Sequence, residues 1–213
     1  MKNITTLLLI ILISNVFYSQ KFEGVITYSI DYELPEIMEA QRSMLPSEMN
    51  TYCKKKTARV EQKTAMGDQI VISNTKTGES TLLMNMMGQK MAIEVGDQKD
   101  NKNESIPSIV YSQESKTIAG YLCEKATYTV FSEEQQDSIS MDLYYTIKIP
   151  SLYNPQFKEL KGIPLEYTIN TQGMSMTFEA TKVESKKLSK SLFNIPKEYE
   201  TISLEEFKKM MGQ

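Results

Sequence analysis

The chain of 213 residues contains no histidine, and this absence excludes several kinds of chemistry at once. Ser-His-Asp triads, Cys-His pairs and histidine-ligated zinc or iron sites all need an imidazole. Carboxylate pairs, Ser-Lys pairs or bound metals could still act, but the commonest general base is missing. We therefore expect a protein that is not an enzyme and that uses no cofactor and no metal.

Cysteine is scarce too, since Cys53 and Cys123 are the only two. A bridge between them would close a loop of about 70 residues, worth ~4 kcal/mol in the chain-entropy treatment. The alternative is two buried thiols that never meet, and the spacing does not choose between the two. The chain has no C-x-x-C motif, so a redox function is not expected.

Tryptophan is absent, and arginine occurs only at Arg42 and Arg59. The one basic cluster, at residues 54–56, lacks aromatic neighbours at the spacing of nucleic-acid readers, and the formal net charge is −3. Nucleic acid is therefore not an expected partner.

The first nineteen residues have the layout of a secretory signal peptide. Lys2 provides a basic start, residues 7–13 are an unbroken apolar run, and the small residue Ser19 precedes Gln20. The run is shorter than the ~20 residues that span a bilayer, and no later segment is apolar enough to do so. We expect cleavage near Ser19-Gln20 and a soluble, monomeric, periplasmic or secreted product, with residues 20–213 as a single domain.

Alternation of apolar and polar residues with a period of two dominates the rest of the chain. It is clearest where Met174, Met176, Phe178 and Ala180 alternate with polar residues. Strands of this kind have one buried and one wetted face, which is typical of antiparallel sheets. The pattern predicts about ten strands, near residues 22–33, 50–55, 57–64, 68–74, 80–86, 89–96, 121–132, 139–149, 164–171 and 174–183.

Three helices are expected between and after these strands. Residues 35–49 offer an apolar side, and Asn154-Pro155 could start a short helix that ends at residue 160. Ser203 and Glu206 form a capping box for a helix over 204–211. The predicted fold class is mainly β (α+β), a single curved antiparallel sheet or half-barrel with a helix after the first strand and short helices covering the concave face.

Five short segments, in this order along the chain, carry a family resemblance. They are FEGVITY (22–28), KTIAGYLCEKA (116–126), KGIPLEY (161–167), MTFEA (176–180) and LFNIP (192–196). Together they resemble a domain-of-unknown-function family of exported Bacteroidota proteins, which looks similar to the LolA/LolB-like lipoprotein-carrier superfamily. The resemblance implies a half-barrel with helices capping a hydrophobic cavity, and it brings no catalytic residues with it.

Methionine is unusually common, with fourteen residues. Thioethers can bind Cu(I), but such sites usually add a histidine or cysteine, so no metal site is expected. Methionine also suits adaptable apolar surfaces. A concave face that would fit acyl chains is predicted from Met84, Met86, Met91, Ile93, Met141, Tyr145, Tyr167, Ile169, Met174, Met176 and Phe178.

Two functions follow from this surface. We expect a non-enzymatic exported protein that binds a hydrophobic ligand, such as a lipid or acyl chain, in a half-barrel cavity, with the helix at 35–49 as a movable lid. In the alternative, the helices fill the cavity as an ordinary core, and the protein is a structural or interaction module whose partner is an envelope protein.

Overall fold

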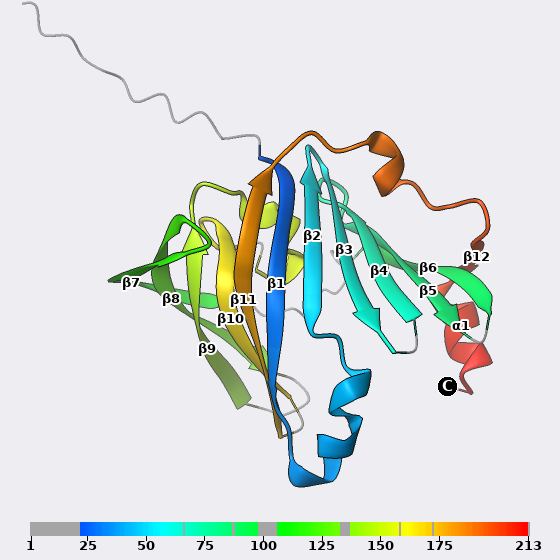
Figure 1. The fold of residues 1–213 in the computed structure, drawn as a ribbon, viewed down its shortest axis with the longest axis horizontal. Helices are drawn as coiled ribbons and strands as arrows, with labels where there is room; N and C mark the ends of the chain where they lie inside the picture. The colour runs from blue at the N-terminus through cyan, green and yellow to red at the C-terminus, as the bar shows by residue number, and fades with distance from the viewer. Residues whose placement is uncertain are drawn as a thin grey trace, which may run out of the picture.

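The computed structural model describes residues 22–65, 67–86, 88–97, 106–132, 137–157, 159–171 and 173–212. Within these ranges, twelve strands form one sheet in the order β12-β6-β5-β4-β3-β2-β1-β11-β10-β9-β8-β7. The sheet is not closed, because β12 and β7 are its two edges, and Figure 1 shows it curving between them. The predicted signal peptide, residues 1–19, lies outside the described residues.

The strands are β1 (Glu23–Glu33), β2 (Glu48–Lys54), β3 (Thr57–Thr64), β4 (Gly67–Asn74), β5 (Glu79–Met86), β6 (Gln89–Asp97), β7 (Ser108–Ile118), β8 (Tyr121–Ser132), β9 (Asp137–Thr146), β10 (Ile163–Thr171), β11 (Met174–Ser185) and β12 (Glu200–Ser203). Neighbouring strands run antiparallel, except that β12 runs parallel to β6. The predicted mainly β fold with a curved antiparallel sheet is confirmed, but the strand count of about ten was too low. The two strands that were not predicted, β7 and β12, are the two edges.

The helices differ more from the prediction. They are the 3-10 helices η1 (Glu36–Met44), η3 (Ser151–Tyr153), η4 (Pro155–Phe157) and η5 (Lys190–Phe193), and the α-helix α1 (Leu204–Met210). The expected helix over 35–49 is wrong in type and placement: η1 buries no residue, and Ile37 is 88% exposed. Residues 48–49 instead begin β2. The capping box of Ser203 and Glu206 is confirmed at the start of α1.

The sheet has an inner face, defined here as the face that carries Tyr28, Tyr167 and Phe178. The register connects this face across the sheet, since Tyr28 pairs with Ala180 of β11 and with Met49 of β2. The main core lies against it and includes buried residues of β1, β2 and β8–β11 together with the segment 149–163. That segment contains η3 and η4, so these two short helices pack against part of the inner face. The other helices, η1, η5 and α1, bury no residue, so the placement of the helices differs from the prediction.

The segment before β10 passes very close to β9. A Cβ at Gly162 would lie 2.0 Å from the carbonyl oxygen of Thr146, so only glycine fits here without a backbone shift. The same approach lets the amide of Ile163 donate to the carbonyl oxygen of Ile149 at 2.9 Å. Gly162 thus permits the turn that returns η3 and η4 to the sheet.

The C-terminal segment covers the outer face of the other half of the sheet. Arg59 of β3 donates from Nη1 to the carbonyl oxygen of Leu192 at 3.0 Å. Beyond this contact lies a second, smaller core of Ile70, Leu83 and Ala92, against which Tyr199 packs. The segment therefore joins β11, in the middle of the sheet, to the edge strand β12.

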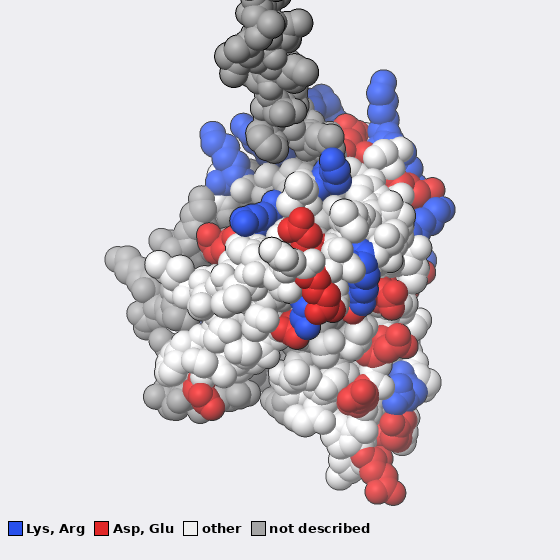
Figure 2. All heavy atoms as spheres, turned by 90° about the vertical axis from the view of Figure 1, so that its left-hand side faces the viewer, with Lys and Arg blue, Asp and Glu red and all other residues white. Residues whose placement is uncertain are grey.

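Acidic and basic side chains interleave on the face that carries β7, β8 and β9 (Figure 2). Lys125 of β8 pairs with Asp142 of β9 at 2.9 Å, and Lys116 of β7 pairs with Glu166 of β10 at 2.6 Å. Exposed pairs of this kind add little stability. Their effect on the surface is to mix the signs of charge over these strands.

Candidate functional site

The chain's own side chains fill the inner face of β8–β11. Phe157 of η4 is fully buried, and its ring centroid lies 5.2 Å from that of Tyr128 and 5.0 Å from that of Tyr167, in edge-to-face geometry. Tyr167 in turn stacks on Phe178 with a centroid separation of 4.8 Å. These rings form a continuous aromatic core where the sequence predicted a ligand surface.

The buried tyrosines of this core have backbone acceptors. The hydroxyl of Tyr28 donates to the carbonyl oxygen of Pro164 at 2.9 Å, and that of Tyr128 donates to the carbonyl oxygen of Gln156 at 3.1 Å. Burial raises the pKa of Tyr28 and of Tyr167 well above the usual value of 10.0. These phenols therefore stay protonated near neutral pH, where they pack and donate but do not act as bases.

Nine of the eleven residues predicted to bind a ligand divide into two groups. Tyr145, Tyr167 and Phe178 belong to the main core, and Met141, Ile169 and Met176 pack against it. Met84 faces Met91 across β5 and β6, on the other half of the inner face, where Met91 and Ile93 are buried. Met174 is half-buried at the start of β11, and the side chain of Met86 is outside the described part of the chain.

The two cysteines are free, buried thiols on β2 and β8. The disulfide that the sequence left open is therefore not present in this structure. Burial raises the pKa of the Cys53 thiol far above its usual value and that of Cys123 to about 11. Both sulfurs are protonated at neutral pH and serve as small apolar groups in the core.

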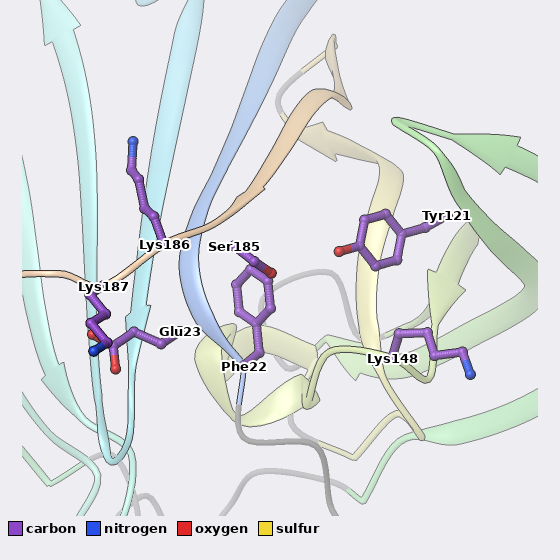
Figure 3. Close-up of a pocket in the computed structure, with 7 residues that line it drawn as sticks. All are labelled: Phe22, Glu23, Tyr121, Lys148, Ser185, Lys186 and Lys187. Carbon is purple, nitrogen blue, oxygen red and sulfur yellow. The ribbon is translucent and has the colours of Figure 1, made fainter.

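A pocket of about 640 Å³ opens where the start of β1 and the end of β11 lie near the start of β8 (Figure 3). Four stretches of chain that are distant in sequence supply its lining, which consists of Phe22, Glu23, Tyr121, Lys148, Ser185, Lys186 and Lys187. None of the eleven predicted residues is among them. Apart from the adjacent lysines after β11, no sequence pattern indicates this site, because the pocket exists only through contacts between these stretches.

The interior of the pocket combines an aromatic surface with hydroxyl groups. Figure 3 shows the Phe22 ring next to Ser185, with the hydroxyl of Tyr121 directed toward both. The backbone of Phe22 is held by Tyr153, whose hydroxyl donates to the Phe22 carbonyl oxygen at 3.1 Å. Gly24 allows this packing, because a Cβ there would lie 2.1 Å from the carbonyl oxygen of Glu184 and 2.9 Å from the Phe22 ring.

The rim of the pocket carries three lysines and one carboxylate. Glu23 accepts from Nζ of Lys54 and, at 2.7 Å, from the amide of Leu188. The hydrogen bond from Lys54 and then that from Leu188 lower the pKa of Glu23. Its charge is thus already neutralised by Lys54, and the net charge that faces a ligand is positive.

No family model matches this chain, and a search of the curated proteins gives no match. Among the described residues, no group of three or more Cys, Asp or Glu side chains could hold a metal ion. Within that same part of the chain, no helix has both the length and the apolar character needed to cross a membrane. Fold and site together define a mainly β protein with one open twelve-stranded sheet and a basic-rimmed pocket near the start of β1.

Proposed function

We propose that this chain is a non-enzymatic exported protein that holds a hydrophobic ligand, such as a lipid or an acyl chain. The observation that carries the proposal is the pocket of about 640 Å³ with Phe22 and Tyr121 in its lining. Ligand pockets of small molecules usually enclose about 300–1,000 Å³. The ligand would lie at this end of the half-barrel, and not over the filled core of β8–β11.

Two expectations from the sequence support this proposal. The signal-peptide layout of residues 1–19 gives an exported address. The resemblance to the LolA/LolB-like superfamily agrees with an open, curved antiparallel sheet. That resemblance implies a hydrophobic cavity capped by helices.

A second candidate function is an envelope interaction or structural module with a filled core and no ligand. The observation that favours it is Phe157, which is fully buried between Tyr128 and Tyr167. With that ring in place, side chains of the protein itself occupy part of the inner face of β8–β11. The two functions differ in whether the pocket at the end of the sheet is occupied.

Mass spectrometry of organic extracts tests the proposal, with the chain from Gln20 onward purified without detergent. A lipid present at about one molecule per chain, and lost in Tyr121→Ser, is the expected result, because this change removes an aromatic wall of the pocket. Leu122→Ser is the matched control, since Leu122 is the next residue on β8 and is 66% exposed. An empty extract from the folded protein would favour the interaction module.

A further inference from the structure

The charges around the pocket indicate what kind of hydrophobic ligand it takes. We propose that the pocket selects an amphiphilic anion, whose apolar part lies against Phe22 and Tyr121 and whose carboxylate, sulfonate or phosphate pairs with Lys148 or with Lys187 at the rim. This inference rests on the proposed function and adds the chemical class of the ligand.

The first argument is the state of each charged group at the rim. Glu23 is paired with Lys54, and Nζ of Lys186 lies 3.2 Å from a carboxylate oxygen of Glu184. In the part of the chain that the structure describes, no ion pair engages Nζ of Lys148 or Lys187. Two ammonium groups are therefore left without a carboxylate at the rim of one pocket.

The second argument is where these two lysines come from. Lys148 lies in the turn after β9, and Lys187 follows the end of β11. Figure 3 shows them on opposite sides of the Phe22 and Tyr121 rings, with their side chains at the periphery. Both side chains are exposed and have long flexible stems, so either ammonium can reach an anionic group at the mouth of the pocket.

The third argument is the pair of hydroxyl groups in the pocket lining, where Tyr121 is half-buried and Ser185 is exposed. Among the described residues, no side-chain hydrogen bond engages the hydroxyl of Tyr121 or of Ser185. A hydroxyl can both donate and accept, so the two could bind oxygens of the ligand's polar group. An apolar molecule without polar atoms would gain nothing from these hydroxyls or from the two ammonium groups, which would keep only water as a partner.

The matched probes 1-anilinonaphthalene-8-sulfonate and N-phenyl-1-naphthylamine test the inference, because they share one aromatic skeleton and differ by the sulfonate. Both fluoresce on entering an apolar site, and the chain has no tryptophan to interfere. We expect one sulfonate probe to bind per chain, more tightly than the neutral probe. Its affinity should fall as the salt concentration is raised. The neutral probe should show no salt dependence.

The lysine variants locate the effect. Lys148→Gln and Lys187→Gln should each lower the affinity for the sulfonate probe about two- to fivefold, which is the range expected for one exposed ion pair. The double variant should lower this affinity about tenfold. The neutral probe should bind all of them alike. Lys63→Gln, an exposed lysine on β3 and outside the pocket lining, is the control and should change neither probe.

The outcomes separate the two proposals. If both probes bind equally, or if the sulfonate is indifferent to both lysine changes, the anionic ligand class is wrong while a hydrophobic pocket stands. If neither probe binds the protein, with its β-sheet circular dichroism intact, the ligand-binding function fails together with the inference. Since the changed side chains are exposed, loss of the fold is not expected in any of the variants.

Discussion

Replacing Phe157 with alanine tests directly whether the inner face of β8–β11 is a packed core. Burial of a phenylalanine side chain stabilises a protein by about 1.5–3 kcal/mol. Each of its two edge-to-face contacts, with Tyr128 and Tyr167, adds about 0.5–1.5 kcal/mol. The sum agrees with the roughly 3–5 kcal/mol that Phe→Ala changes cost in protein cores. We expect the free energy of unfolding to fall by about 4 kcal/mol.

Urea denaturation followed by circular dichroism measures this change. With a slope of about 2.5 kcal/mol per M, the midpoint should move down by about 1.6 M. Leu152→Ala, five residues earlier in η3 and 38% exposed, is the control and should lose less than about 1 kcal/mol. If Phe157→Ala also lowers the free energy of unfolding by less than about 1 kcal/mol, the inner face of β8–β11 is not a core that depends on this ring, and the reasoning is refuted.

Three further predictions concern other parts of the molecule. Glu23→Gln should destabilise the protein at pH 7, because the hydrogen bond from Lys54 lowers the pKa of Glu23 and so stabilises the folded state while the carboxyl is ionised. This stabilisation is lost when the carboxyl is protonated, so the substitution should have a smaller effect as the pH falls below 4.5. Paired urea titrations of the two proteins at several pH values measure the difference. Cys53 and Cys123 should not react with Ellman's reagent at pH 8 in the folded protein, and both should react in urea without a reductant, whereas a disulfide would release no thiol. Gly162→Ala should cost about 1–3 kcal/mol in thermal or urea unfolding, because its Cβ would overlap a carbonyl group of β9; an unchanged stability would mean that this turn can move.

The central strands could be predicted because apolar and polar side chains alternate over most of their length. Met176 and Phe178 of β11 lie opposite Ile169 and Tyr167 of β10, as their shared face requires. The edge strand β7 was missed because its middle is polar on both faces and its pairing with β8 shifts between Tyr111 and Ser115. A register shift moves side chains to the other face and so destroys the period that sequence reasoning uses.

Other features depend on tertiary contacts that no local pattern encodes. β12 has only four residues and pairs parallel with β6, which lies about a hundred residues earlier in the chain. The sequence predicted a short helix that starts at Asn154-Pro155, but no local pattern showed that η4 turns the ring of Phe157 into the core. The pocket was missed for the same reason, since Phe22, Tyr121 and Lys148 belong to unrelated segments that only the curvature of the sheet brings together.

The pairing of β1 with β11 has a consequence for how the chain acquires its structure. Ser29 lies opposite Glu179, 150 residues later, and these two strands are in the middle of the sheet (Figure 1). During synthesis, β1 can pair with β2 early, but its other edge stays open until β11 has emerged. Such non-local pairing slows folding to about milliseconds to seconds, and it leaves unpaired strand edges in the meantime. The two runs of sequential strands, β1–β6 and β7–β11, can therefore form as separate halves, and the sheet becomes continuous only when the last of the β11 residues has been made.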